Sequence, residues 1–440
     1  MMKLLVIGSG GREHALVWKL AQSRHVTQMW CAPGNGGIGE ERLARDSSLV
    51  ECVKIGAEDL IGLLRFAKEN RPDLTVVGPD NPLGLGIVDL FQLEGLRIWG
   101  PNQKAAQFES SKAFAQKFME KHGVPTARSG IFSDAAAARK FADSLGGRCA
   151  VKADGLALGK GVLICRSVTE ANDAIQQILV QGAFGKAGAT IVIQELLEGT
   201  EISLHALCDG QAAKLFPTSQ DHKRALDGDQ GPNTGGMGTY SPVPFLTAKQ
   251  LAETGDKILG PWLKGCHTES IDFRGIIYPG IMLTKEGPKV LEFNARFGDP
   301  ETQVYLTRLE SDLVELLEAS VDGTLSKMDL RWSDQSAVCV VMASGGYPGE
   351  YAKGKVISGL QEAGKLPNTK VFHAGTQRLS GQGSPYLTNG GRVLGVTAWA
   401  ETLTKAREAA YAAVDKIKFD GAQCRRDIAA KALAHARTND

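Results

Sequence analysis

The order of apolar and amphipathic segments in the first eighty residues constrains the fold more than any other feature of this sequence. Apolar runs at residues 3–7, 27–32 and 74–77 have the length of buried strands. Between these runs, apolar residues recur with the spacing of an amphipathic helix, up to about residue 21 and again over residues 59–70. Strands that alternate with helices predict an open parallel sheet, because each helix returns the chain to the edge where the previous strand began. Ligands of such sheets bind at the carboxyl ends of the strands.

The loop after the first strand, residues 8–13, begins like a dinucleotide-binding turn but departs from that pattern twice. The pattern requires glycine or alanine where Glu13 stands. It also requires an acidic residue after the second strand, where residues 31–34 read Cys-Ala-Pro-Gly. A nicotinamide dinucleotide is therefore disfavoured. Backbone N–H groups at the start of the next helix still suit a phosphate, with Arg12 beside them, and a plain tight turn is the alternative.

Residues 289–297 alternate with the period of a strand and form a predicted hairpin with residues 273–284. The alternation gives an apolar face with Leu291, Phe293, Ala295 and Phe297, and a polar face with Glu292, Asn294 and Arg296. A carboxylate and a carboxamide two residues apart offer the hard oxygen ligands that Mg²⁺ prefers, and this ion is usually shared with substrate phosphates. The planar fork of the arginine suits a phosphate oxygen. An edge strand with a solvated polar face is the alternative.

A glycine-rich segment at residues 153–161 separates strands predicted at 149–152 and 162–165, and this order predicts a hairpin flap. It is not a Walker A loop, because only three residues separate Gly155 from Gly159 and because glycine follows Lys160. Such a flap can fold over phosphates with its backbone amides and its lysine. A mobile surface hairpin is the alternative.

Two further segments contain polar residues suited to binding. Acids flank an apolar pair in residues 195–201, which suits an adenine hinge where backbone groups contact the base and Glu201 holds ribose hydroxyls. Acids exposed in a surface turn are the alternative. Residues 220–238 combine glycines with charges and cannot form a core, and long loops of this kind are usually functional or disordered. The proline and the Thr-Gly-Gly sequence favour function.

Composition and charge exclude several classes of protein. The chain has 440 residues, 22% of them charged, and a formal net charge of +1, which predicts a soluble multidomain protein with no nucleic-acid or membrane partner. No apolar run reaches the roughly 18 residues of a membrane span, and the N-terminus does not resemble a signal peptide, so we expect a cytoplasmic protein. The eight cysteines have neither C-x-x-C nor zinc spacing and are expected to be buried free thiols.

Several motifs together resemble the ATP-grasp ligases: Lys112 ahead of an apolar helix, Lys152 in a strand, the glycine flap and the E-x-N strand. Longer runs are similar to the glycinamide ribonucleotide synthetase family of that superfamily. They lie at residues 6–15, 151–155, 220–224, 231–238 and 292–301, and near the end of the chain at 371–376 and 388–394. The resemblance extends from residue 3 to about residue 428. Two departures are Gly37, a second glycine after the Pro-Gly-Asn-x-Gly turn, and Asp80, where the family more often has glutamate.

The resemblance implies a multidomain protein of α/β and α+β class. An N-terminal open parallel α/β domain (residues 1–103) is followed by a central ATP-grasp domain (104–328), whose flap subdomain spans about 125–195. A small C-terminal α+β lobe (329–440) completes the chain.

The resemblance also implies a reaction of purine biosynthesis. ATP, glycine and 5-phosphoribosylamine give glycinamide ribonucleotide, ADP and phosphate through a glycyl phosphate intermediate. The first step brings two anions together, so charge neutralisation and in-line positioning should dominate catalysis. Mg²⁺ or Mn²⁺ is the implied metal. The chain is expected to be a monomer, with a dimer as the alternative.

The family's binding sites transfer to matching positions of this sequence. Glu292 and Asn294 are expected to hold the metal. The nucleotide is expected to contact Lys112, Lys152, Asp154, Gly155, Gly159, Lys160, Gly161, Glu195, Leu197 and Glu201. Phosphoribosylamine and glycine are expected to contact Gly10, Gly11, Arg12, Glu13, Gly34, Asn35, Gly235, Gly236, Met237, Gly238, Asp299 and Glu301. Arg296 is the candidate for the transferring phosphoryl group, and Asp221 and Lys223 complete the catalytic set.

Three other functions compete with this assignment. A formate-activating or carboxylating ATP-grasp enzyme would share the nucleotide site and differ in residues 218–240. A nucleotide-dependent oxidoreductase is suggested only by the turn at residues 8–13, against which Glu13 argues. A regulator that binds nucleotide without chemistry is disfavoured by the retained lysines and metal ligands.

Overall fold

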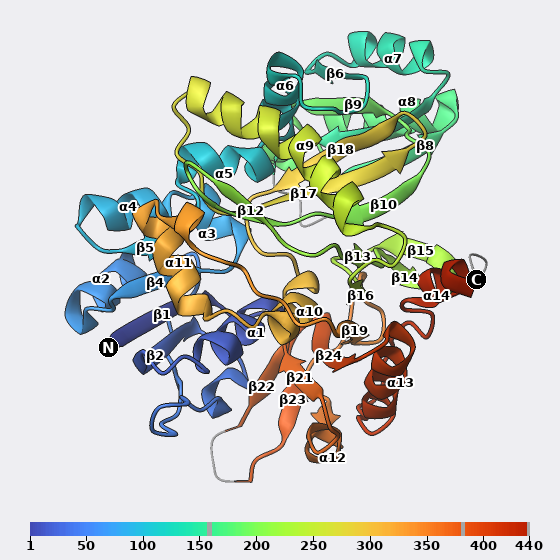
Figure 1. The fold of residues 1–440 in the computed structure, drawn as a ribbon. Coiled ribbons are helices and arrows are strands. Elements are labelled where there is room, and N and C mark those ends of the chain that lie inside the picture. The colour runs from blue at the N-terminus through green and yellow to red at the C-terminus, as the bar shows by residue number, and fades with distance from the viewer. Residues whose placement is uncertain (156–160, 380–382, 438–440) are drawn as a thin grey trace.

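The computed structural model describes residues 1–155, 161–379 and 383–437. An N-terminal domain and a C-terminal lobe lie side by side below a central domain in Figure 1. The two lower units contact each other through α1 (Gly11–Leu20) and β21 (Thr369–His373). This mixed α/β and α+β architecture confirms the predicted fold class.

The N-terminal domain is built on a parallel sheet with strand order β3-β2-β1-β4-β5. The strands are β1 (Met2–Gly8), β2 (Val26–Pro33), β3 (Glu51–Cys52), β4 (Leu74–Val77) and β5 (Ile98–Trp99), and the helices beside α1 are α2 (Leu60–Asn70), α3 (Asp80–Gly84) and α4 (Ile87–Leu93). Residues 4–7 of the central strand β1 are completely buried, as expected for a parallel strand covered on both faces. The predicted parallel sheet is confirmed.

The central domain contains a small antiparallel sheet with strand order β6-β9-β7-β8. Its elements are β6 (Ser129–Phe132), α7 (Ala135–Ser144), β7 (Arg148–Ala153), β8 (Val162–Arg166), α8 (Val168–Ile175) and β9 (Ile191–Glu195). The two helices share an apolar core with this sheet. Strands β7 and β8 form the predicted hairpin, and residues 156–160 at its tip lie outside the described residues.

A second sheet of the central domain has the order β10-β17-β11-β12, with β18 paired to β17. Its strands are β10 (Thr200–Ser203), β11 (Ala206–Asp209), β12 (Ala213–Leu215), β17 (Arg274–Thr284) and β18 (Gly287–Asn294). The accompanying helices are α5 (Gln103–Ser110), α6 (Lys112–His122), α9 (Ala248–Thr268) and α11 (Leu313–Asp322). Helix α10 (Glu301–Arg308) packs instead against α1 and against strands of the C-terminal sheet. The predicted hairpin of residues 273–284 with 289–297 is confirmed as β17–β18.

The C-terminal lobe is organised by a sheet with strand order β13-β16-β19-β24-β21. Its strands besides β21 are β13 (Gln220–Asp221), β16 (Gly238–Ser241), β19 (Ser336–Ala343) and β24 (Arg392–Ala400). Around it lie β14 (Arg224–Leu226), β15 (Gln230–Asn233), β20 (Val356–Ile357), α12 (Leu360–Gly364), β22 (Thr376–Arg378), β23 (Tyr386–Thr388), α13 (Leu403–Val414) and α14 (Ala430–Arg437). Strands β13 and β16 belong to the segment predicted as a loop, and that prediction is wrong for them. Their place in the sheet depends on β19, about a hundred residues further along the chain, and the sheet crosses the predicted boundary at residue 329.

Two predictions from composition can be compared with this structure. The cysteines are free thiols, and all but Cys52 and Cys424 are buried. Among the residues that the structure describes, no helix combines the length and the apolarity needed to cross a membrane.

A buried polar network joins the N-terminal domain to the C-terminal lobe. His14 accepts the His373 backbone N–H on Nδ1 (2.8 Å), and its Nε2 lies 2.8 Å from Glu41 Oε1, which also pairs with Lys370. Burial opposes ionisation of Glu41, but His14 and Lys370 lower the pKa of this carboxyl to about 2. The network therefore contains an ionised carboxylate that depends on both lobes for its partners.

Glu41→Gln is expected to destabilise this junction by up to about 3 kcal/mol, because it removes the counter-charge of the partly buried Lys370 ammonium and the charged partner of the buried His14 ring. The lowered pKa means that the stabilisation is present above pH 4.5, the ordinary value, and is lost as the pH falls towards 2. Thermal unfolding should show a lower Tm at about pH 7. Glu40→Gln is the matched control, since Glu40 pairs with Arg378 at an exposed site. Equal Tm values for the two variants would contradict the prediction.

Candidate active site

The metal-binding residues predicted on β18 lie next to an irregularity of the strand. Gly280 pairs with Glu292 and Ile281 with Val290, so Leu291 is an extra residue, a β-bulge. Val290 is fully buried, whereas Leu291 is partly exposed. The predicted alternation is therefore interrupted here, and Leu291 is less buried than Phe293, although the two are predicted to share an apolar face. The bulge leaves the Leu291 carbonyl free to accept a hydrogen bond from Lys152 Nζ (2.8 Å).

Glu292 lies in the field of three lysines. Burial opposes its ionisation, but Lys112, Lys152 and Lys223 lower the pKa of this carboxyl to about 2. Burial lowers the pKa of Lys152 to about 8, with Glu292 opposing the shift. Burial also acts against the charge of Lys223, yet Glu201 and Glu292 raise its pKa, and its ammonium pairs with Glu201. The cluster has more positive than negative groups, which suits a polyphosphate.

A small pocket lies beside this cluster. Lys112, Lys152 and Glu292 line it together with apolar residues that include Met119 and Val192. An apolar cavity with a few charged groups at its wall is the usual form of a ligand site. The structure thus brings together three residues that the sequence assigns to ATP and metal.

At residues 195–197, where β9 ends, some hydrogen-bonding groups have protein partners and one backbone N–H does not. Glu195 Oε1 accepts the Arg128 backbone N–H (2.9 Å), so this side chain holds β6 instead of projecting freely. The Leu196 N–H donates to the Arg148 carbonyl (3.1 Å). The backbone N–H of Leu197 has no partner among the described residues, which leaves it available to the edge of a base.

Two described residues of the flap, Asp154 and Gly161, bond to neighbouring elements of the central domain. Asp154 Oδ1 accepts bonds from Ser111 Oγ (3.0 Å) and the Ala113 N–H (2.7 Å), so it caps the start of α6. The Gly161 carbonyl accepts the Ala153 N–H (2.8 Å) in the hairpin. Gly159 and Lys160, predicted to contact the nucleotide, lie outside the described residues.

In the glycine loop after β1, the Glu13 side chain folds back and bonds to residues of the same loop. Glu13 Oε2 accepts the Gly10 N–H (2.6 Å), and Oε1 accepts from Arg12 Nε (2.5 Å). A Cβ atom at Gly78 would lie 2.2 Å from Glu13 Oε1, so glycine is required there. Glu13 therefore shapes the loop from inside, which explains why neither glycine nor alanine stands at this position. The Glu13 side chain is engaged within the loop, and its predicted substrate contact stays a prediction.

Asn35 connects the N-terminal domain to the C-terminal lobe. Its Nδ2 donates to the carbonyls of Ser9 (2.8 Å) and His373 (2.7 Å), and its Oδ1 accepts the Gly37 N–H (3.0 Å). The side chain is thereby committed to structure. Only its main chain and that of Gly34 remain as possible substrate contacts in this turn.

An arginine of the C-terminal lobe, absent from the predicted site, ties two predicted substrate loops together. Arg392, at the start of β24, donates to the Gly235 carbonyl (2.5 Å), the Asp299 carbonyl (2.6 Å) and Asp299 Oδ2 (2.8 Å). Gly236 has φ +109°, and a Cβ atom there would lie 2.7 Å from Asp221 Oδ1. The loop at residues 235–236 is thus packed closely against Asp221 on one side and bonded to the Arg392 guanidinium.

Two predicted substrate contacts point into the core. Met237 is completely buried, so its side chain cannot reach a substrate. Glu301 is 2% exposed, and its Oε1 accepts bonds from Tyr278 Oη (2.6 Å) and Ser203 Oγ (3.2 Å). Glu301 lies behind Asp221, whose pKa burial and Glu301 together raise well above its ordinary value. The Glu301 carboxylate is therefore held by Tyr278 and Ser203, and its predicted amine contact stays a prediction, whereas Asp299 lies beside Arg392.

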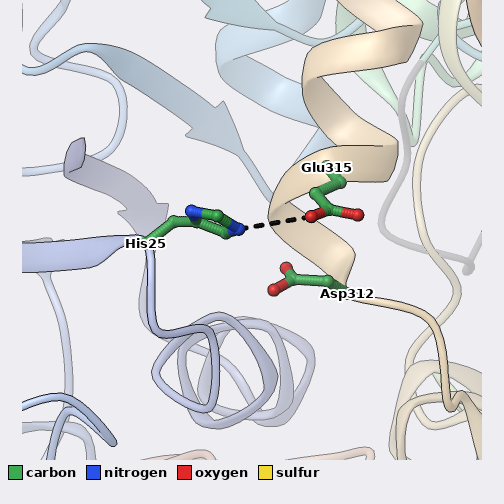
Figure 2. Close-up of side chains that lie close together, drawn as sticks. All are labelled: His25, Asp312 and Glu315. Carbon is green, nitrogen blue, oxygen red and sulfur yellow. Dashed lines mark hydrogen bonds and ion pairs between the residues drawn. The ribbon is translucent and has the colours of Figure 1, made fainter. Parts of the chain in front are cut away.

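A separate group of potential metal ligands, His25, Asp312 and Glu315, lies at the junction of the N-terminal domain and α11 (Figure 2). His25 Nε2 is 3.2 Å from Glu315 Oε1, and both side chains are about half exposed. Asp312 Oδ1 accepts the Val314 N–H (2.9 Å) and caps α11. These contacts describe a surface hydrogen bond beside a helix cap.

Comparisons with known proteins cover nearly the whole chain. Residues 2–109, 110–302 and 337–431 match the N domain, the ATP-grasp (A) domain and the C domain of phosphoribosylglycinamide synthetase. The chain is 48% identical over 438 residues to phosphoribosylamine–glycine ligase of Allochromatium vinosum, covering 99% of this chain and 100% of the relative. It is 46% identical over 437 residues to the ligase of Vibrio cholerae, covering 98% and 99%.

Solved structures show the same similarity. The crystal structure of phosphoribosylamine–glycine ligase from Thermotoga maritima superposes with a TM-score of 0.80 at 31% identity, covering 97% of this chain and 100% of that one. The N5-carboxyaminoimidazole ribonucleotide synthetase of Thermotoga maritima has a TM-score of 0.59 at 16% identity, over 95% and 99% of the two chains. The second likeness concerns the fold alone.

Proposed function

This chain belongs to the phosphoribosylglycinamide synthetase family, and from that premise we propose how its residues ligate glycine to 5-phosphoribosylamine with ATP. It is an ATP-dependent carboxylate–amine ligase that forms glycinamide ribonucleotide in purine biosynthesis. The glycine carboxylate attacks the γ-phosphorus of ATP, which releases ADP and leaves glycyl phosphate. The amine of phosphoribosylamine then attacks the acyl carbon, and phosphate departs.

The observation that best supports the site assignment is the ionised Glu292 surrounded by Lys112, Lys152 and Lys223. We assign the first two lysines to the ATP phosphates, the flap at residues 154–161 to their cover, and residues 195–201 to adenosine. Lysines suit this task because the attack joins two anions, and each positive charge reduces their repulsion.

The donors on β18 fit a hard divalent cation. Glu292 is ionised, and Asn294 Oδ1 has only a long contact of 3.4 Å from Arg296, so both oxygens can serve as ligands. We propose that these two residues hold Mg²⁺ or Mn²⁺. A bound divalent cation would neutralise triphosphate charge.

The remaining assignments concern the substrates. We propose that Arg296 contacts the transferring phosphoryl group and that Asp221 and Lys223 line the glycine end. Backbone groups of residues 10–12, 34–35 and 235–236, the Arg12 side chain and Asp299 are proposed to surround phosphoribosylamine. We propose that the protein is a monomer, with a dimer as the alternative. The use of ATP supports a cytoplasmic location.

The function is tested by measuring ADP and phosphate release from ATP while glycine and phosphoribosylamine are each omitted in turn. ADP formation should require glycine, and steady turnover should require both substrates. Turnover with formate or bicarbonate in place of glycine would instead support the formate-activating or carboxylating alternative. NAD(P)H binding would support the oxidoreductase.

ATP binding is expected to weaken above a pH of about 8. Burial lowers the pKa of Lys152 to about 8, so the ammonium loses its proton in this range and with it the attraction for phosphate. The Kd for ATP should be up to about tenfold higher at about pH 9 than at about pH 7. Lys152→Met should bind ATP more weakly at neutral pH and show a smaller pH dependence. Constant affinity of the unmodified protein across this range would contradict the prediction.

A further inference from the structure

Arg296 needs support from outside its own strand. It follows the last residue of β18, so no strand ladder fixes its main chain. The guanidinium pairs with Glu109 Oε1 (2.9 Å), and makes longer contacts to the Phe297 carbonyl (3.2 Å) and Asn294 Oδ1 (3.4 Å). Within the described part of the chain, its buried Nε has no partner. The contact with Glu109 is the shortest of the three and the one to a carboxyl group, whose pKa burial raises and Arg296 lowers.

Glu109 holds two adjacent residues with one carboxylate. While Oε1 pairs with Arg296, Oε2 accepts the Ala295 backbone N–H (2.8 Å). Glu109 itself is 8% exposed, so water competes little with either bond. One side chain therefore determines both the path of the main chain at residue 295 and the direction of the guanidinium at residue 296.

The helix that presents Glu109 is itself anchored to β18. Phe108, the preceding residue of α5, is 1% exposed, and its ring packs edge-on against Phe293 with centroids 5.7 Å apart. Helix and strand are thus fixed to each other by a core contact immediately beside the ion pair. The distance between Glu109 and Arg296 does not depend on flexible segments.

Other acids compete for the same arginine. Burial acts against the charge of Arg296, while Glu109, Asp80 and Glu301 among others raise its pKa. Arg296 is also among the cations that lower the pKa of Glu292. Glu109 is the acid that lies within ion-pair distance of the guanidinium (2.9 Å).

We infer that Glu109 is a positioning residue for phosphoryl transfer, which acts by holding Arg296 and does not contact substrate itself. The inference rests on the proposed role of Arg296. It adds to the active site a carboxylate that precedes its arginine by 187 positions and that the sequence motifs did not indicate.

A double-mutant cycle tests the inference. Glu109→Gln keeps an oxygen for the Ala295 N–H and removes the charge. We expect kcat to fall about 10- to 100-fold, as for a misplaced catalytic group, with the KM for ATP unchanged within about twofold. Arg296→Gln should lower kcat further. The double variant should match Arg296→Gln alone, because Glu109 acts only through that arginine.

The outcomes separate the inference from the proposed function. A normal kcat for Glu109→Gln, or losses that multiply in the double variant, would overturn the positioning role. A normal kcat for Arg296→Gln would overturn both that role and the assignment of Arg296.

Two further variants complete the test. If Glu109→Gln does not fold, Glu109→Asp replaces it in the double-mutant cycle with Arg296→Gln. This variant keeps the charge but has a shorter side chain, and the expected changes in kcat are the same. Glu94→Gln is the matched control, because Glu94 forms an exposed pair with Lys68 (2.6 Å) remote from the site. Its kcat should equal that of the unmodified protein.

Discussion

Glu292→Ala is expected to abolish glycine-dependent ADP formation, with kcat about 10²- to 10³-fold below that of the unmodified enzyme. The substitution removes an ionised carboxylate from the nucleotide cavity and leaves Lys112, Lys152 and Lys223 in place. ATP should therefore remain bound while the chemical step is lost. Titration calorimetry with ATP and a coupled assay for ADP measure the two properties separately.

The same variant should change the pH dependence of ATP binding. The charge of Glu292 raises the pKa of Lys152 against the effect of burial, so its removal should bring that pKa below about 8. ATP affinity should then begin to fall at lower pH than in the unmodified protein. Glu286→Ala is the control on the same hairpin, because Glu286 forms an exposed pair with Lys289 (2.7 Å). Near-normal turnover by a folded Glu292→Ala protein would rule out the proposed metal ligand.

Arg392→Gln is expected to lower kcat/KM for phosphoribosylamine about 100-fold, with the KM for ATP nearly unchanged. Arg392 holds the Gly235 carbonyl and both the carbonyl and the carboxylate of Asp299. Its loss removes the counter-charge of the partly buried Asp299 carboxylate, which keeps the Gln303 amide (2.7 Å), and releases two loops. Breaking a buried pair costs about 3 to 5 kcal/mol, and this partly buried pair should cost less. Steady-state kinetics with each substrate varied in turn gives the comparison.

The control for this prediction is an exposed arginine of the same lobe. Arg426 pairs with Asp415 (2.7 Å), and both side chains are more than half exposed, so Arg426→Gln should leave kinetics unchanged. Equal kcat/KM values for phosphoribosylamine in the two variants would show that Arg392 has no part in substrate binding. A parallel rise in the KM for ATP would indicate general misfolding instead.

Local patterns predicted much of the fold. The alternation of apolar strands and amphipathic helices predicted the parallel N-terminal sheet, and the glycine-rich segment between strands predicted the β7–β8 hairpin. The hairpin pairs neighbouring segments, so its signal lies within a short window. The N-terminal sheet also pairs β1 with the later strand β4, and there the repeated strand–helix order carried the prediction. The pattern failed on β18, where the bulge at Leu291 interrupts the alternation, and on β16, whose partner β19 is distant in sequence.

For the candidate site, too, sequence patterns identified some residues correctly and left the role of others to the structure. The types of residue on β18 and β7 identified Glu292 and Lys152 as binding groups, and the structure brings them to one cavity. Glu301 and Asn35 occur in motifs of the same kind, yet their side chains are occupied by Tyr278 and by the Ser9 and His373 carbonyls. A motif records that a residue is needed, but not whether it contacts substrate or holds a neighbour.

The sequence by itself determined the order of strands and helices, the nucleotide-binding residue types and membership of the ligase family, because these depend on composition within short segments. Only the tertiary structure decided that Glu109 meets Arg296 and that Arg392 meets Asp299. Each pair joins residues 93 or more positions apart. Such contacts exist only after the sheets have packed, because packing sets which charges share a buried space.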